Sequence, residues 1–83
     1  MEVQRLDFTI EPFVDGQPGA HVTAPVAALE ALGVTVDFGA FGSTCIAETE
    51  QMPELVAEVV RVAYANGATR VTIEIDGVSV DGA

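Results

Sequence analysis

The stretch VTVDFGAFGSTCIAE, residues 34–48, decides the fold, because it reads as two short strands joined by a tight turn. Val34, Val36 and Phe38 alternate with polar residues, which is the pattern of a half-buried strand. Residues 39–42 contain two glycines, and a second strand follows over residues 43–48. Because a connection this short joins antiparallel neighbours, we expect a β-hairpin in the middle of the chain.

Residues 3–14 predict a strand before this hairpin. Leu6, Phe8 and Ile10 fall on one side of it, and polar residues fall on the other. Pro12 cannot donate a hydrogen bond to a neighbouring strand, so regular pairing should weaken there. Asp-Gly and Pro-Gly pairs then mark a loop over residues 15–19.

A helix is predicted between this loop and the hairpin. Its apolar side chains follow helical spacing: Val22, Val26, Leu29 and Leu32. Thr23 is the expected N-cap, which places Pro25 in the first turn, where its missing N–H costs little. Gly33 is expected to end the helix. His21 precedes this start, so we expect an exposed residue with no ligand contact.

A second helix and a last strand complete the pattern. The helix is expected to start over residues 49–53, with Pro53 in its first turn, and to close at Asn66-Gly67. Its expected core-facing residues are Leu55, Val56, Val59, Val62 and Ala63. Glu58 and Arg61 can pair on its outer face. Residues 70–76 then alternate, with Val71, Ile73 and Ile75 expected to face inward.

The order β-α-β-β-α-β predicts an α+β, ferredoxin-like sandwich: a four-stranded antiparallel sheet with both helices on one face. Right-handed crossovers place the first and third strands at the centre. We expect residues 1–83 to form one domain, with residues 3–78 ordered. The open face of the sheet should carry hydroxyls and charges, from Arg5, Asp7, Thr9, Glu11, Thr35, Asp37, Thr72, Glu74 and Asp76.

The charge is strongly one-sided. Thirteen carboxylates face three arginines and no lysine, which gives a net charge of −10. Nucleic acid is therefore an unsuitable partner, because phosphate binding needs clustered Lys or Arg. Two explanations of the acidity stay open: attraction of a cationic ligand, or solubility, as in the salt-rich cytoplasm of a halophile.

Length and hydropathy bound location and assembly. No apolar run approaches the ~18–20 residues of a membrane span, and the N-terminus does not resemble a signal peptide. A single cysteine suits a reducing compartment, so we expect a cytoplasmic protein without a membrane partner. A chain of 83 residues buries only about 60–65% of its unfolded surface, which favours self-association.

Residues that would support catalysis or metal binding are sparse. The chain has one cysteine and one histidine, with no CxxC pair and no phosphate-binding loop. Cys45 is expected in the core, with no base placed beside it. An enzyme that uses Cys45 is therefore the least favoured reading, and we expect no catalytic residue, no metal and no cofactor.

Several stretches resemble a known family. DFTIEPFVDGQPGAHV, ALEALGV and above all FGSTCIAE before an amphipathic helix are similar to the YkoF-like thiamine/hydroxymethylpyrimidine-binding family and to related single-domain thiamine-binding proteins. The resemblance covers residues 3–78. It implies a ferredoxin-like fold, no catalysis, thiamine or its pyrimidine half as ligand, and pairing of two domains. Since this chain holds one repeat, the second would come from another subunit of a dimer or tetramer.

The implied ligand suggests candidate site residues. Thiamine joins a flat aminopyrimidine to a cationic thiazolium, so it needs polar partners in the ring plane, an apolar wall and negative charge. The Ser43 and Thr44 hydroxyls suit the first need, and Phe38 and Phe41 suit the second, with Phe13 nearby. The candidates for negative charge are Glu11, Asp37 and Glu48, and Thr9 completes the set.

Each candidate also has a structural explanation. Ser43 and Thr44 could simply begin a strand, and Phe38 continues an alternation that points to the core. Thr9 and Asp37 could lie in a subunit interface. The alternative function is a regulatory or structural oligomerisation domain without affinity for thiamine.

Overall fold

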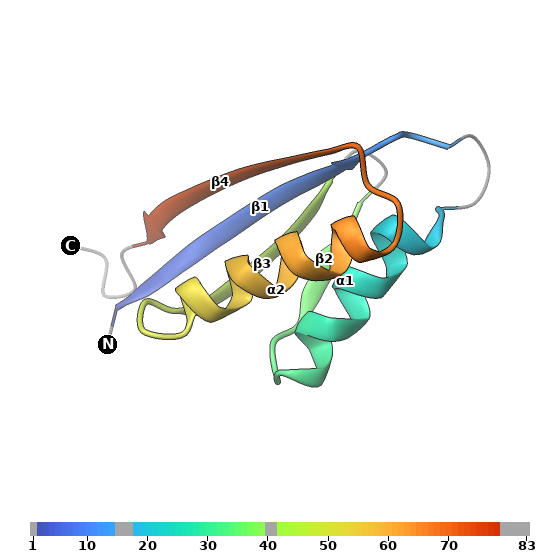
Figure 1. Cartoon of the computed structure of the whole chain (residues 1–83). Coiled ribbons are helices and arrows are strands. Elements are labelled where there is room, and N and C mark those ends of the chain that lie inside the picture. Colours follow the sequence, from blue (N-terminus) through green and yellow to red (C-terminus); the bar gives the residue numbers. More distant parts are fainter. Residues whose placement is uncertain (1, 15–17, 40–41, 79–83) are drawn as a thin grey trace.

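The computed structural model describes residues 2–14, 18–39 and 42–78. Within these ranges the elements follow the predicted order (Figure 1). They are β1 (Val3–Glu11), α1 (Ala20–Ala31), β2 (Val36–Phe38), β3 (Ser43–Glu48), α2 (Met52–Ala65) and β4 (Arg70–Val78). No helix in the described ranges is long and apolar enough to cross a bilayer.

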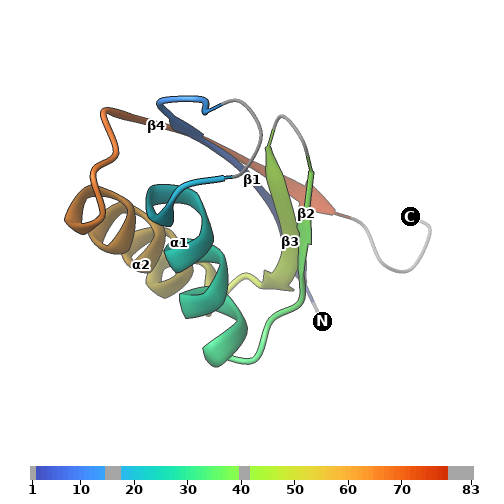
Figure 2. The same cartoon turned by 90° about the vertical axis from the view of Figure 1, so that its right-hand side faces the viewer.

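The predicted ferredoxin-like topology is confirmed. The four-stranded sheet has the order β2-β3-β1-β4, and each neighbouring pair is antiparallel. Both helices lie on one face of the sheet (Figure 2). β1 and β3 are therefore central, as the crossover rule requires. The hairpin is closed by the Gly39 N–H, which donates to the Gly42 carbonyl at 2.8 Å.

The core lies between the sheet and the two helices. Its buried members are Leu6, Phe8, Ile10, Leu29, Val36, Cys45, Ala47, Met52, Leu55, Val59 and Ala63. Cys45 is 3% exposed, which confirms its prediction as a core residue. Opposed residues share a face of an antiparallel sheet, and Leu6 stands between Cys45 of β3 and Ile75 of β4.

The predicted start of α1 is wrong. The helix begins at Ala20 with Gly19 as its N-cap, so Pro25 stands inside it and is buried. A proline there removes one helical hydrogen bond, to the carbonyl four residues earlier. Tertiary contacts offset this cost: Pro25 is among the fully buried side chains, and His21 in the added turn bonds the end of the β1 segment.

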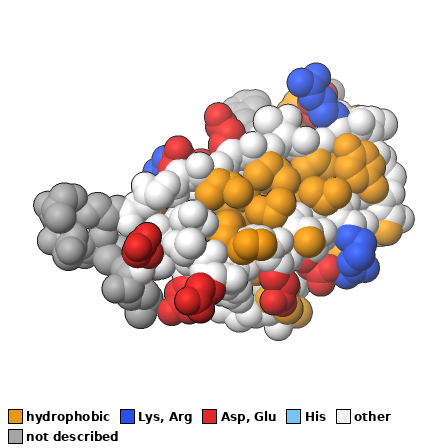
Figure 3. All heavy atoms as spheres, turned by 60° about the vertical axis from the view of Figure 1, so that its left-hand side comes forward, with side chains coloured by type: hydrophobic (Ala, Val, Ile, Leu, Met, Phe, Trp, Pro, Cys, Tyr) orange, Lys and Arg blue, Asp and Glu red, His pale blue; other side chains and the backbone are white. Residues whose placement is uncertain are grey.

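Most predictions for α2 and β4 hold. Pro53 lies in the first turn of α2, Gly67 follows the helix with φ 98°, and Glu58 pairs with Arg61. Ile75, however, is 44% exposed, although its side chain was expected to face inward. β4 is an edge strand, so its helix-facing side chains are covered from one flank only. Figure 3 shows hydrophobic side chains reaching the surface on this side.

Candidate functional site

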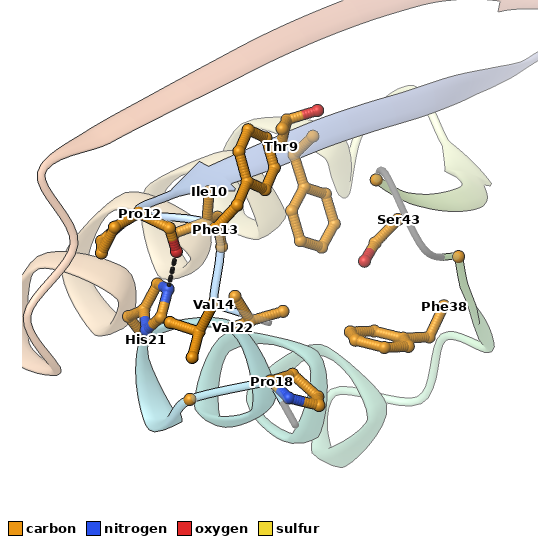
Figure 4. A pocket seen from close by; sticks show the side chains of 14 residues that line it. Thr9, Ile10, Pro12, Phe13, Val14, Pro18, His21, Val22, Phe38 and Ser43 are labelled. Atoms are coloured by element: carbon orange, nitrogen blue, oxygen red, sulfur yellow. Dashed lines mark hydrogen bonds between the residues drawn. The ribbon is translucent and has the colours of Figure 1, made fainter. Parts of the chain in front are cut away.

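A cavity of about 610 Å³ lies at one end of the sheet, on the face that carries the helices. It is bounded by the end of β1, the segment that follows β1, the start of α1 and the two ends of the β2–β3 hairpin (Figure 4). The β2–β3 turn lies at this corner, because β2 ends at Phe38, which pairs with Ser43 at the start of β3.

The walls of the cavity are mainly apolar. Phe8 and Ile10 of β1 are buried at its base, and Val22 of α1 joins them. Phe13 and Phe38 also belong to the lining, and they are 64% and 44% exposed. Phe38 was a candidate for an apolar wall, with a place in the core as the alternative, and its exposure contradicts the core alternative. Its side chain keeps the inward direction of its strand.

Ser43 supplies a polar atom inside the cavity. It pairs with Phe8 on one side and Phe38 on the other, so all three side chains share the helix-facing side of the sheet. The residue is only 4% exposed, yet its hydroxyl points into the cavity in Figure 4. A hydroxyl both donates and accepts, so Ser43 can bond a ligand edge of either polarity.

His21 also lines the cavity, contrary to the prediction of an exposed residue. It is 7% exposed, and its Nε2 lies 2.6 Å from the Pro12 carbonyl oxygen. Because a carbonyl only accepts, Nε2 carries the proton and donates. A Cβ at Gly19 would come within 2.8 Å of the Nδ1 atom of His21, so glycine is needed there for close approach.

Thr44 lies on the opposite face of the sheet from Ser43, because neighbouring residues of a strand alternate. Its hydroxyl donates to Asp7 at 2.6 Å. Asp37 stands directly opposite Thr44 in the β2–β3 pair and is exposed. One small molecule in the cavity therefore cannot contact both Ser43 and Thr44 of the same chain.

The remaining candidates are dispersed. Thr9 contributes to the cavity lining, and its hydroxyl would lie 3.3 Å from a Cβ at Gly42. Glu11 ends β1 beside Arg70, with 3.8 Å between carboxylate and guanidinium. Glu48 is exposed at the far end of β3. Phe41 lies outside the described residues.

The charged side chains of the sheet do not contribute to the described lining of this cavity. Among the described lining residues none is Asp or Glu. On the open face, Arg5 donates to Asp76 at 3.0 Å and lies 3.4 Å from Asp7. The hydrogen bond to Asp76 and the charge of Asp7 raise the pKa of Arg5. The cavity is thus a mainly apolar space beside an acidic surface.

The described residues offer little for metal or nucleophilic chemistry. They contain no group of three or more His, Cys, Asp or Glu side chains that could hold a metal ion. Burial raises the pKa of the Cys45 thiol, and the charge of Asp7 adds to the rise. A raised pKa disfavours the reactive thiolate.

Comparisons with known proteins support the fold. No family model and no curated protein matches the sequence. A Thermotoga maritima structure, provisionally named as a thiamine biosynthesis/salvage protein, is 20% identical with a TM-score of 0.70. The comparison covers 94% of this chain and 90% of that one. A Bacillus cereus structure of the domain of unknown function DUF77 is 18% identical with a TM-score of 0.67, covering 94% and 76%. The Streptococcus pneumoniae protein SP2199 is 19% identical, with a TM-score of 0.63 and coverage of 95% and 87%.

Sequence reasoning missed His21 as a lining residue and did not separate Ser43 from Thr44. The alternation of β3 does separate Ser43 from Thr44. Cys45 and Ala47 point to the core, so Ser43, two residues before Cys45, must point to the same face. The position of His21 carried no such signal. The position of His21 depends on where α1 begins, and Pro25 led to a predicted start that is later than the observed one.

Proposed function

We propose that the protein binds thiamine or its hydroxymethylpyrimidine half, without catalysing a reaction, in the cavity beside Ser43. The observation that carries this proposal is the character of the cavity. Its volume of about 610 Å³ falls within the ~300–1,000 Å³ of small-molecule sites, and apolar walls surround a few polar atoms. The fold shared with a Thermotoga maritima protein provisionally named for thiamine biosynthesis or salvage supports the ligand class.

In this proposal the pyrimidine occupies the cavity. The flat ring packs against the exposed ring of Phe38, and Ser43 bonds a nitrogen or the amino group in the ring plane. His21 is held by Pro12 and contributes the face of its ring to the wall rather than a mobile donor.

The thiazolium of thiamine would lie at the opening. No carboxylate lines the described part of the cavity, and a desolvated cation without a partner is strongly unfavourable. The net charge of −10 still attracts the thiazolium cation, and added salt shortens the range of this attraction. Thiamine binding should therefore weaken with added salt more than binding of neutral hydroxymethylpyrimidine does.

Isothermal titration calorimetry with both ligands, at low and high salt, tests the proposal. Ser43→Ala should weaken binding about three- to tenfold, the usual loss for one hydrogen bond, and Phe38→Ala about tenfold. Thr44→Val is the matched control, because its side chain lies on the other face, and it should bind like the native protein. Circular dichroism establishes that each variant is folded.

Two results would contradict this site. The first is the absence of heat at millimolar concentrations of either ligand. The second is a loss of binding in Thr44→Val with none in Ser43→Ala, which would move the site to the open face of the sheet.

A further inference from the structure

Large hydrophobic side chains that line the cavity are exposed at three positions: Phe13, Val14 and Phe38. Phe13 has the largest exposed fraction of them, 64%. Single exposed hydrophobic residues are common on protein surfaces, whereas several that converge on one concave surface are typical of a binding site. The exposure of Phe13 therefore points to a ligand contact, because a side chain this accessible contributes little to the core.

The backbone that leads to Phe13 is fixed by two hydrogen bonds. The Glu11 carbonyl accepts from the Thr69 N–H at 2.8 Å, which ties the end of β1 to the residues before β4. The Pro12 carbonyl accepts from His21 Nε2 at 2.6 Å, which ties the next residue to the first turn of α1. Phe13 is thus attached to a backbone that is already held in place. Positioning before binding lowers the entropy cost of a contact.

The two exposed phenylalanines reach the cavity from different elements. Phe13 belongs to the segment after β1, and Phe38 ends β2 in the hairpin (Figure 4). A flat aromatic ligand has two faces and an edge. Phe38 can cover one face and the Ser43 hydroxyl can bond the edge, which leaves the second face for Phe13.

We propose that Phe13 is a ligand-binding residue, which packs against the ring face that Phe38 leaves uncovered, and that the His21–Pro12 hydrogen bond positions it. The inference rests on the proposed function and deepens it. It assigns the cavity to flat aromatic rings as a class of ligand, and it gives His21 a positioning role. Val14, the next exposed residue of the segment, extends the same apolar wall.

Calorimetry with hydroxymethylpyrimidine tests the contact. Phe13→Ala should raise the dissociation constant about tenfold, because it removes an aromatic contact with the ligand. The melting temperature without ligand should stay close to the native value, because Phe13 is mostly exposed. Phe13→Tyr keeps the ring and should bind like the native protein. Tyr64→Ala is the matched control, since Tyr64 is an exposed aromatic residue outside the cavity lining.

Fluorescence gives a direct reading of the same contact, because the chain contains no tryptophan. The emission of Phe13→Trp should change as hydroxymethylpyrimidine is added and should saturate with the dissociation constant that calorimetry gives for this variant. The emission of Tyr64→Trp should not change.

A double-mutant cycle tests the role of His21. If His21 positions Phe13, then Phe13→Ala should weaken binding much less in a His21→Ala background than in the native chain. His21→Gln should restore the full effect, because its amide N–H can still donate to the Pro12 carbonyl. A purely structural role of His21 would leave the effect of Phe13→Ala unchanged. Circular dichroism establishes that each variant is folded.

The outcomes separate this inference from the proposed function. Native protein that binds hydroxymethylpyrimidine while Phe13→Ala binds it equally well would overturn the contact and leave the proposed function standing. Native protein that gives no heat at millimolar ligand would overturn both. Additive effects in the cycle, with Phe13→Ala equally harmful in both backgrounds, would overturn the positioning role of His21.

Discussion

Ser43 and Thr44 are adjacent in sequence and lie on opposite faces of the sheet. Ser43 faces the cavity and is 4% exposed, whereas Thr44 donates to Asp7 on the open face. The pair therefore offers an internal control, because equally small changes at neighbouring positions test different surfaces. Binding in the apolar cavity, as proposed, would involve Ser43 and not Thr44.

At Cys45 the structure predicts a pH effect. Burial raises the pKa of the folded thiol above its ordinary value of 9.0, so the folded state resists ionisation that the unfolded state permits. The corresponding stabilisation is complete below pH 9.0 and is lost as the pH rises from there through the folded pKa. Urea unfolding between pH 7 and pH 10.5 should show a smaller decline in Cys45→Ala than in the native protein.

Alkylation provides an independent measure of the same burial. Iodoacetamide at pH 8.5 should modify Cys45 slowly in the native protein and quickly in urea. Equal alkylation rates in the native and unfolded states would show that the thiol is accessible. Equal declines of stability with pH in Cys45→Ala and the native protein would show that the pKa of the thiol is ordinary.

At the scale of elements, the sequence predicted type and order well, because each segment has a clear period and clear end signals. β1, β3 and α2 carry strong alternation or helical spacing, and Gly67 and Pro53 mark the ends of α2. The start of α1 was missed because Pro25 normally marks a first turn, whereas here buried packing and the His21 contact hold a proline inside the helix. No local pattern encodes contacts of that kind.

The end of α2 gives a prediction for an element boundary. Gly67 has φ 98°, a left-handed conformation that disfavours side chains, so Gly67→Ala should lower the free energy of unfolding by about 1 kcal/mol. Gly77 is the matched control, since it has no positive φ and a Cβ there would meet nothing within 4 Å. Urea unfolding of both variants measures the difference, and equal stabilities would contradict this reading of the helix end.

At the scale of the whole molecule, the sequence could predict the layers but not the cavity. The cavity lies where β2 ends, and the alternation that pointed Phe38 to the core could not show that its side chain lines this cavity. Likewise, the alternation of β4 correctly predicted that Ile75 points to the helix-facing side of the sheet. It could not show that β4 is an edge strand whose side chains are covered from one flank only. Both errors concern what packs against a side chain, which depends on the assembled fold.

The net charge of −10 gives a prediction for the molecule as a whole. Repulsion among unpaired carboxylates destabilises the compact state, and salt screens it. Raising KCl from 0.1 M to 2 M should stabilise the protein by about 1 kcal/mol or more, which corresponds to ~4–8 °C in melting temperature. Thermal unfolding at fixed protein concentration measures this, and a melting temperature independent of salt would contradict it.

A ¹H–¹⁵N NMR titration with hydroxymethylpyrimidine tests most directly whether the ligand binds in the cavity beside Ser43. We predict that the amide signals of Phe38, Gly42, Ser43 and Val22 shift together, with one saturation curve, and that those of Asp37, Thr44 and Ile46 shift less. Shifts centred on Thr44 and Asp37, or none at millimolar ligand, would contradict binding in the cavity beside Ser43.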